Sequence, residues 1–413
     1  MLFGLMGLGL LCLAITFFGV DALHTRFWTN YLHNTVFFTG ISFMAGFLLL
    51  GFSLSYSGFH ITFKRVWEAY SQFLIVGFLL MIPLVAGVWG HFHHLYHWAD
   101  AESVANDEIL QGKSGFLNPM WYTLSVAFVA IWYLFIRRFR MLSIDEDKNG
   151  TADFAHYKKM KFTAAIFLPI AAFSSAAAIW QWMMSIDAHW YSTMYAWYTS
   201  ASWFVSMIAM TILLIMFMKA QGYMEYITQE HMHDLGKYLF AFSIFWTYLW
   251  FSQYMLIWYA NVGEETVYFQ HRIQEYPVLF YGNLVMNFVL PFLILLRNST
   301  KRKFGTLGFI AILCLFGHWW DFFYMIKPGA LHTAHEVLGH AGHAAADAAA
   351  HGAEHAEHAS HFVSGFTLPG FLEIGTFLGF LALFVFLAMN QLTKASLLPK
   401  NDPYLAESLH HHV

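Results

Sequence analysis

Charged side chains are scarce in this sequence. Asp, Glu, Lys and Arg together make up 11% of the 413 residues, whereas soluble domains carry roughly 25%. Hydrophobic residues reach 58% and the mean hydropathy is +0.50, which excludes a water-soluble globular protein and indicates a membrane protein. The net charge of -4 provides no basis for binding nucleic acid.

Cysteine is nearly absent. The two cysteines, Cys12 and Cys314, both lie in apolar segments, which excludes a disulfide framework and a cysteine-ligated cluster held by this chain alone. Runs that alternate apolar and polar residues, as membrane strands do, are also lacking. The sequence therefore predicts an all-α polytopic membrane protein.

Ten segments are apolar over about the 20 residues that a helix needs to cross a bilayer. They are Leu2–Val20, Asn34–Ser57, Tyr70–Trp89, Met120–Ile136, Phe162–Met184, Thr199–Met218, Tyr238–Ala260, Val278–Leu296, Thr306–Ile326 and Leu368–Asn390. The first has no positive n-region and only a weak cleavage pattern, so we expect a retained helix rather than a signal peptide. We treat residues 1–413 as a single membrane domain.

Lysine and arginine predict the orientation of the helices. Under strict alternation, the connections rich in these residues all fall on one side, which the positive-inside rule makes cytoplasmic. The basic residues of these connections are Lys64, Arg65, Arg137, Arg138, Arg140, Lys148, Lys158, Lys159, Lys161, Lys219, Lys237, Arg297, Lys301, Arg302, Lys303, Lys394 and Lys400. We expect both termini in the cytoplasm and the protein in the inner (cytoplasmic) membrane. The connections His91–Gly115, Asn261–Tyr276 and Lys327–Thr367 would face the periplasm.

One stretch, Ser174–Trp203, places a carboxylate and an imidazole between two predicted spans. Asp187 and His189 are two residues apart in an aromatic turn. Ionisable groups at this depth are costly and mark functional sites, so both are candidates for proton transfer. The alternative is an interfacial aromatic belt with a structural Asp cap, and the residues alone do not separate the two interpretations.

Polar residues inside the spans give a second candidate. His318 and Asp321 are three residues apart in the ninth span, and an embedded carboxylate beside an imidazole can relay protons. A buried ion pair or a cap near the outer surface is the alternative. Asn283 and Asn287 share a helix face, and we interpret them, like Gln253, as hydrogen-bonding contacts between helices.

Histidines are concentrated in the outer connection Lys327–Thr367. His351, His355 and His358 would share one helix face and are weak candidates for binding zinc or copper, although we favour a low-complexity surface. The pattern H-E-x-x-H, which would support a catalytic metal, is absent. A b-type haem needs axial histidines on facing helices, and essentially only His318 lies within a span, so we expect no haem.

The segments WQWMMSIDAHWYSTMYAWYTSASW and HDLGKYLFAFSIFWTYLWFSQYMLIWYANVGEETVYF resemble the F subunit of bacterial alternative complex III, a quinol:electron-acceptor oxidoreductase. That subunit belongs to the NrfD/polysulfide-reductase-C-like superfamily. The resemblance is close over the fifth to ninth spans and looser over the first four. Where the family commonly has proline, this chain has Ala188, which alters the rigidity of the turn rather than its chemistry.

The resemblance implies a fold and a set of partners. It implies two four-helix bundles, here residues 34–184 and 199–326, with the first and tenth spans outside them. The sequence itself adds a His-rich periplasmic loop over 327–367 and a last transmembrane helix over 368–390. The partners would be a sister NrfD-like membrane subunit, an iron–sulfur/molybdopterin-like subunit, haem c subunits, a terminal oxidase and membrane lipid. Haem c and iron–sulfur clusters would belong to those partners, and this chain would bind no cofactor alone.

The same resemblance implies a part in the oxidation of quinol, menaquinol included. The proton-transfer residues would be Asp187, His189, His318 and Asp321. The residues around the quinone ring would be Trp182, Trp190, Gln253 and Tyr254. An equal alternative is that this subunit conducts protons and scaffolds the complex, while its sister binds quinol. Outside the family, the alternatives are a secondary transporter, which would show matched broken helices, and a His-loop metal-binding membrane protein.

Overall fold

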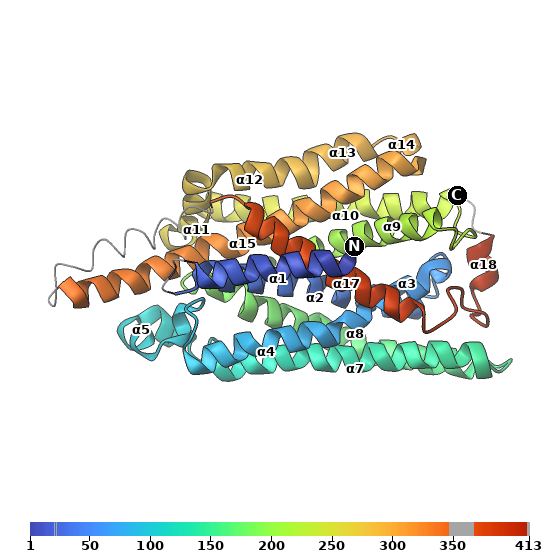
Figure 1. Ribbon diagram of the computed structural model, residues 1–413, viewed down its shortest axis with the longest axis horizontal. Helices are drawn as coiled ribbons and strands as arrows, with labels where there is room; N and C mark the ends of the chain where they lie inside the picture. Colours follow the sequence, from blue (N-terminus) through green and yellow to red (C-terminus); the bar gives the residue numbers. More distant parts are fainter. Residues whose placement is uncertain (20, 22, 347–366, 411–413) are drawn as a thin grey trace.

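The computed structural model describes residues 1–19, 21, 23–346 and 367–410, and every regular element in this part of the chain is a helix. Long helices run side by side along the long axis of the molecule (Figure 1). They are α1 (Leu2–Phe18), α2 (Thr25–Leu54), α4 (Leu74–Gly90), α7 (Pro119–Asn149), α8 (Ala155–Trp182), α9 (Met194–Ala220), α10 (Gln229–Ala260), α15 (Phe304–Ala346) and α17 (Phe371–Leu392). A further rod joins α12 (Pro277–Leu284), the π-helical turn η5 (Val285–Val289) and α13 (Leu290–Leu295).

Short helices lie between the long ones, and one more follows the last of them. They are η1 (Ile61–Phe63), α3 (Lys64–Tyr70), η2 (Ser71–Phe73), η3 (His97–Ala99), α5 (Ala101–Asn106), α6 (Glu108–Lys113), η4 (Met184–Ile186), α11 (Gly263–Glu275), α14 (Asn298–Arg302) and α18 (Leu405–Leu409). Helices α5 and α11 lie at one end of the molecule, whereas α14 and α18 lie at the other (Figure 1).

Eight helical stretches in the described residues are long and apolar enough to cross a membrane, so the chain is a multi-pass membrane protein. They are Thr25–Leu54, Ile61–Gly90, Pro119–Asn149, Ala155–Ile186, Met194–Ala220, Pro277–Leu295, Phe304–His335 and Phe371–Leu392. Each corresponds to a predicted span. The two remaining predicted spans are also helical, but α1 has only 17 residues and many Trp and Tyr side chains make α10 less apolar.

Helix α15 differs most from its predicted span. It continues past the predicted end at Ile326 as far as Ala346, so the first part of the predicted outer loop 327–367 is helical. The metal candidates His351, His355 and His358 lie outside the described residues.

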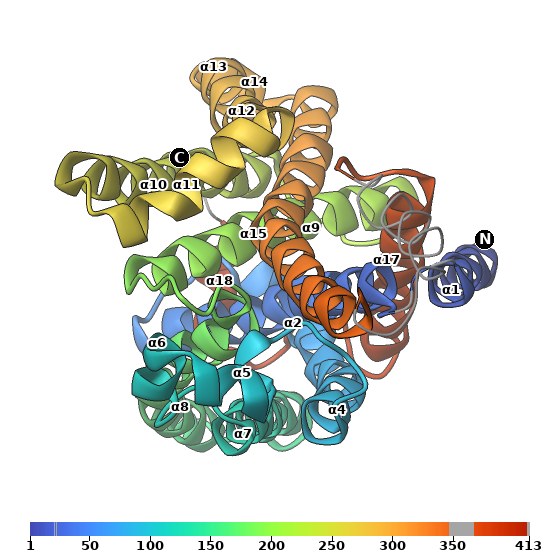
Figure 2. The same cartoon turned by 90° about the vertical axis from the view of Figure 1, so that its left-hand side faces the viewer.

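Helices α2 and α9 lie near the centre of the array (Figure 2). α2 packs against α4 and α8, and also against α9 and α15. α7 packs against α4 and α8, while α10 and α15 pack against α9. The apolar core is therefore continuous through α2 and α9, and the division into two four-helix bundles stays a prediction.

Helices α1 and α17 approach each other closely because glycines face one another. A methyl group on Gly9 would lie 2.6 Å from the Cα atom of Gly379, and one on Gly375 would lie 2.3 Å from the sulfur of Cys12. Small residues allow such close contact between membrane helices. The predicted first and last spans are therefore direct neighbours.

A buried ion pair fixes α17 to α2. Glu373 is fully buried and accepts hydrogen bonds from Arg26 Nε at 2.8 Å and from Asn30 Nδ2 at 3.0 Å. Its second oxygen accepts from Arg26 Nη2 at 3.0 Å and from the backbone N–H of Gly370 at 2.9 Å. These four donors match the roughly four acceptor positions of a carboxylate.

Replacing Glu373 with Gln is expected to lower the free energy of unfolding by about 3 kcal/mol, because Arg26 loses its counter-ion. Thermal unfolding in detergent measures the effect. Glu102, which is exposed in α5, provides the control, since Glu102→Gln should change stability by less than about 0.5 kcal/mol. Equal unfolding temperatures for the two variants would contradict the role given to this ion pair.

At the opposite end, basic residues pair with carboxylates. Lys64 Nζ donates to Asp402 Oδ2 at 2.7 Å, and both side chains are buried. Arg65 pairs with Glu68 at 2.5 Å and also with Asp147. Two of the basic residues used to predict the orientation are thus neutralised within the fold, and the orientation itself stays a prediction.

Candidate functional site

The turn between α8 and α9 carries the first two predicted site residues. α8 ends at Trp182, the single turn η4 follows, and α9 begins at Met194. Asp187 and His189 lie in the segment after η4. Their side chains diverge, and each binds a residue from a different part of the chain.

Asp187 binds Arg272 of α11. Arg272 Nη2 donates to Asp187 Oδ2 at 2.8 Å; the arginine side chain is fully buried, whereas 21% of the Asp187 side chain is exposed. Burial alone lowers the pKa of Arg272, but Asp187 and Tyr268 raise it and the net shift is upward, so the guanidinium stays charged. A methyl group on Gly329 would lie 2.8 Å from Asp187 Oδ2, so glycine is needed at this position of α15.

The face of the Tyr268 ring packs against the Arg272 guanidinium. The central carbon of the Arg272 guanidinium lies 3.5 Å from the centre of the Tyr268 ring, and the Trp190 indole stacks on the same ring at 3.8 Å. Two groups this close to one ring must occupy opposite faces, so Tyr268 is enclosed between a cation and an indole. Arg272 also donates to the carbonyl of Met325 at 3.3 Å, which joins α11 to α15.

His189 faces the connection between α4 and α7. Its Nε2 donates to Asp107 Oδ2 at 2.5 Å, and this hydrogen bond lowers the pKa of Asp107. Lys113 Nζ donates to the carbonyls of Ala188 and His189 at 2.7 and 2.8 Å, and burial lowers the pKa of Lys113. Side chains from this connection therefore fix the conformation of the turn.

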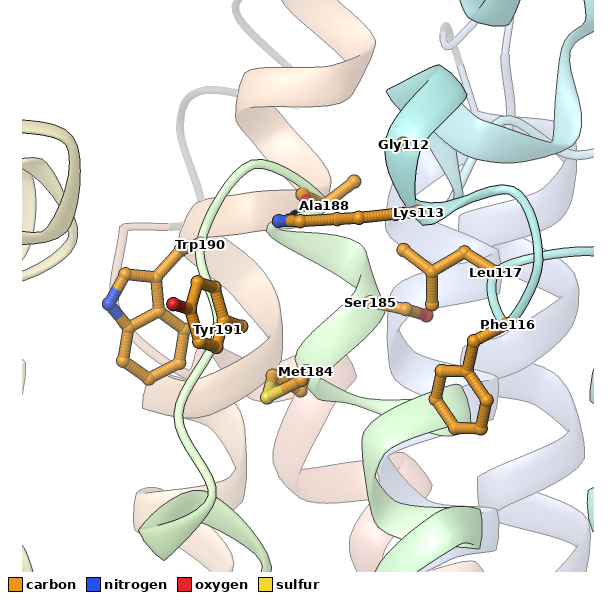
Figure 3. A pocket seen from close by; sticks show the side chains of 9 residues that line it. All are labelled: Gly112, Lys113, Phe116, Leu117, Met184, Ser185, Ala188, Trp190 and Tyr191. Carbon is orange, nitrogen blue, oxygen red and sulfur yellow. Dashed lines mark hydrogen bonds between the residues drawn. The ribbon is translucent and has the colours of Figure 1, made fainter. Parts of the chain in front are cut away.

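Two cavities flank the turn and share Ala188 and Trp190. The larger, which we call the Asp187 cavity, has a volume of about 490 Å³. It is lined by His97, Ile109, Ile186, Asp187, Ala188, His189, Trp190, Glu264, Val267, Tyr268, His271, Arg272, Glu275, His332 and Thr333. The second is mainly apolar and has a volume of about 350 Å³. It is lined by Gly112, Lys113, Phe116, Leu117, Met184, Ser185, Ala188, Trp190 and Tyr191, with Lys113 reaching across to Ala188 (Figure 3).

The second predicted pair lies inside the helix array, on α15. Asp321 is fully buried and accepts four hydrogen bonds. The donors are Tyr198 and Ser202 (3.0 Å) on α9, Trp246 Nε1 (3.0 Å) on α10 and Asn283 Nδ2 (2.7 Å) on α12. A carboxylate has about four acceptor positions, so three helices converge on one carboxylate and fill them.

His318 is joined to Asp321 through Ser202. His318 Nδ1 lies 4.0 Å from Asp321 Oδ2, too far for a hydrogen bond. The Ser202 hydroxyl lies 2.8 Å from His318 Nδ1 and 3.0 Å from Asp321 Oδ2. A hydroxyl donates one proton and can accept another hydrogen bond at the same time. Ser202 can therefore pass a proton between the two side chains.

Tyrosines fill the space between this buried pair and the Asp187 cavity. Tyr324 is one turn beyond Asp321 on α15, and its ring lies 5.6 Å from the Arg272 guanidinium. Its buried hydroxyl has no hydrogen-bond partner among the described residues. The rings of Tyr195 and Tyr198 lie 6.1 Å apart. Three tyrosine side chains therefore lie between the surroundings of Asp321 and those of Arg272.

Asn283 and Asn287 form the hydrogen bonds between helices that the sequence predicts, and one hydrogen bond to each other. Asn287 Nδ2 donates to Asn283 Oδ1 at 2.6 Å and to the carbonyl of Gly317 on α15 at 2.9 Å, while Asn283 donates to Asp321. Asn287 belongs to η5, and π-helical turns of this kind occur frequently at functional sites. The two asparagines therefore support the buried carboxylate.

The four residues predicted around a quinone ring lie at the end of α8, in the turn after η4 and on α10. Trp182 is buried and donates to Ser125 Oγ at 2.8 Å. Gln253 and Tyr254 lie on α10. Of the four, Trp190 alone lines the two cavities beside the turn.

Several residues that complete the site were not found from the sequence. Arg272 had been placed in an outer loop that is instead the helix α11. Tyr198 and Ser202 are four residues apart, a spacing that places both on one helix face and that was an available signal. No local pattern distinguishes Trp246 from the other tryptophans of the chain.

No protein-family model matches the chain, and no curated protein matches it at a significant level. Within the described residues, no three His, Cys, Asp or Glu side chains are placed to hold a metal ion. A function is therefore inferred from the two sites and from the resemblance noted in the sequence.

Proposed function

We propose that this multi-pass membrane protein conducts protons between the Asp187 cavity and the buried pair Asp321–His318, as a membrane subunit of a quinol oxidoreductase of the alternative complex III type. The proposal is carried by the Asp321 site, where four donors and a bridging serine surround a carboxylate inside a membrane helix. Ionisable groups kept at such a depth mark proton and ion pathways.

Two of the four hydrogen bonds to Asp321 can reverse direction. Trp246 and the amide of Asn283 donate through N–H groups, so they hold the carboxylate in place. Tyr198 and Ser202 are hydroxyls, which can donate to an ionised carboxylate or accept from a protonated one. Asp321 can thus bind and release a proton while all four partners remain in contact.

The proposed route leaves Asp321 through Tyr198. Its next members would be Tyr195, whose ring neighbours that of Tyr198, and Tyr324, whose ring lies beside the Arg272 guanidinium that pairs with Asp187. Asp187 is partly exposed and lines a cavity, so it is the carboxylate on this route that water reaches. Proton exchange with the outside would therefore take place at Asp187.

The resemblance supplies the proposed partners. Haem c and iron–sulfur subunits would carry the electrons of quinol oxidation, and this chain would carry protons. We assign quinol binding to the sister membrane subunit, because three of the four ring-contact candidates in this chain line neither cavity beside the turn.

Replacing Ser202 with Ala is expected to slow proton transfer at least about tenfold, because the hydroxyl between Asp321 and His318 is lost. The measurement is the rate of proton release from the complex in proteoliposomes, followed with a pH-sensitive dye. Ser206 is the matched control on the same helix, since its hydroxyl donates to the carbonyl of Ser202 at 2.8 Å. Ser206→Ala should keep the original rate, and equal rates in both variants would refute the relay.

A further inference from the structure

The Asp187 cavity brings titratable side chains together from four parts of the chain. Its titratable lining residues are His97, Asp187, His189, Glu264, Tyr268, His271, Arg272, Glu275 and His332. The histidines come from η3, from the turn after η4, from α11 and from α15. Imidazole is the side chain whose ordinary pKa lies closest to neutrality, so this wall has the chemistry of a proton buffer.

The four histidines form two pairs. The rings of His97 and His189 lie 5.9 Å apart, and those of His271 and His332 lie 6.2 Å apart. Within a pair, a proton needs at most one intervening water molecule or a small ring rotation to move from one imidazole to the other.

His189 and His271 also bind carboxylates. His189 Nε2 lies 2.5 Å from Asp107 Oδ2, and His271 Nε2 lies 2.8 Å from Glu275 Oε2. The side chains of His189 and His271 are 43% and 23% exposed, so water reaches both, whereas Arg272 below them is fully buried.

We propose that this cavity is a proton-collecting vestibule, whose histidines exchange protons with bulk water and with Asp187. The inference rests on the proposed function, because it concerns the outer end of the same route. In each step one O–H or N–H bond breaks and another forms: an imidazole nitrogen takes a proton from water or buffer, and the imidazolium then gives it to the Asp187 carboxylate. The same two steps run in reverse when a proton is released. A volume of about 490 Å³ has room for several water molecules between these groups.

The charges around the cavity suit this task. Free protons are rare in neutral water, so buffering groups at the mouth raise the supply to a single carboxylate. Glu264 and Glu275 attract cations to the cavity, whereas the fixed charge of Arg272 behind Asp187 repels them. A proton can bind to the Asp187 carboxylate and be released again, whereas a metal cation at the same place would be repelled by the positive charge of Arg272.

The test removes the imidazoles from the full chain in the variant His189→Gln/His271→Gln/His332→Gln. The measurement is the rate at which the Asp321 carboxyl exchanges its proton after a pH jump, followed by infrared spectroscopy in nanodiscs. In weakly buffered medium we expect the variant to be at least about tenfold slower than the original protein. Added imidazole, a mobile substitute for the missing side chains, should restore the rate.

Controls separate this inference from the proposed function. His91→Gln/His94→Gln, at histidines that do not line the cavity, should exchange at the original rate without imidazole. The single variant His189→Gln retains the α11 pair and should be slowed less than the triple variant. Exchange by the triple variant at the original rate in weak buffer, or a slow rate that imidazole does not restore, would overturn the vestibule. An Asp321 carboxyl that never exchanges in the unaltered protein would instead overturn the proposed function.

Discussion

Replacing Asp321 with Asn is expected to lower the number of protons translocated per electron, while electron transfer through the partner subunits persists in part. An amide has the shape of the carboxyl group but does not bind and release a proton at neutral pH. Its NH₂ group is also a hydrogen-bond donor, and it would face the N–H donors of Trp246 and Asn283. The relay would therefore be interrupted at its buried end.

The measurement uses the complex isolated gently from its native membrane, with its haem and iron–sulfur subunits, in proteoliposomes. Trp246→Phe is the matched control, because it removes one donor to Asp321 and leaves the carboxylate in place. We expect that variant to retain most of the proton-to-electron ratio. An unaltered ratio in a fully assembled Asp321→Asn complex would show that protons do not pass this residue.

Replacing Asp187 with Asn is expected to lower the free energy of unfolding by about 3 kcal/mol, because a fully buried arginine loses its counter-ion. Replacing the other partner, in Arg272→Gln, should lower the free energy of unfolding by less. It leaves the charge on Asp187, whose side chain is partly exposed, so water in the cavity can solvate the carboxylate. The asymmetry follows directly from the different burial of the two partners.

Denaturant unfolding in detergent measures both changes, and the double variant Asp187→Asn/Arg272→Gln completes a thermodynamic cycle. The double variant should be more stable than Asp187→Asn alone, since it contains no unpaired charge. Glu102→Gln, at an exposed position of α5, should stay within about 0.5 kcal/mol of the original protein. Strictly additive effects would contradict a direct ion pair between Asp187 and Arg272.

The fold could be predicted from the sequence where apolar length alone decides it. Eight predicted spans correspond to helices long and apolar enough to cross a membrane. The end of α15 could not be placed, because the Ala- and His-rich sequence after Ile326 is less apolar than a span although it is helical as far as Ala346. Orientation relative to a membrane still rests on the distribution of Lys and Arg.

The candidate site was predicted where its residues are close in sequence, and missed where they are distant. His318 and Asp321, one helical turn apart, do belong to one buried cluster. Asp187 and His189, two residues apart, are both predicted from the sequence as proton-transfer residues. Each binds a partner more than 80 residues away, Arg272 or Asp107, and no local spacing predicts such contacts.

The most direct test of the central claim is an infrared difference spectrum of the full chain, recorded as the pH of the medium is changed. A protonated carboxyl group has a C=O band that disappears on ionisation. If Asp321 takes up and releases a proton, one such band is present in the original protein and in Trp246→Phe, and it is missing in Asp321→Asn. Identical difference spectra for the original protein and Asp321→Asn would contradict proton conduction through this site.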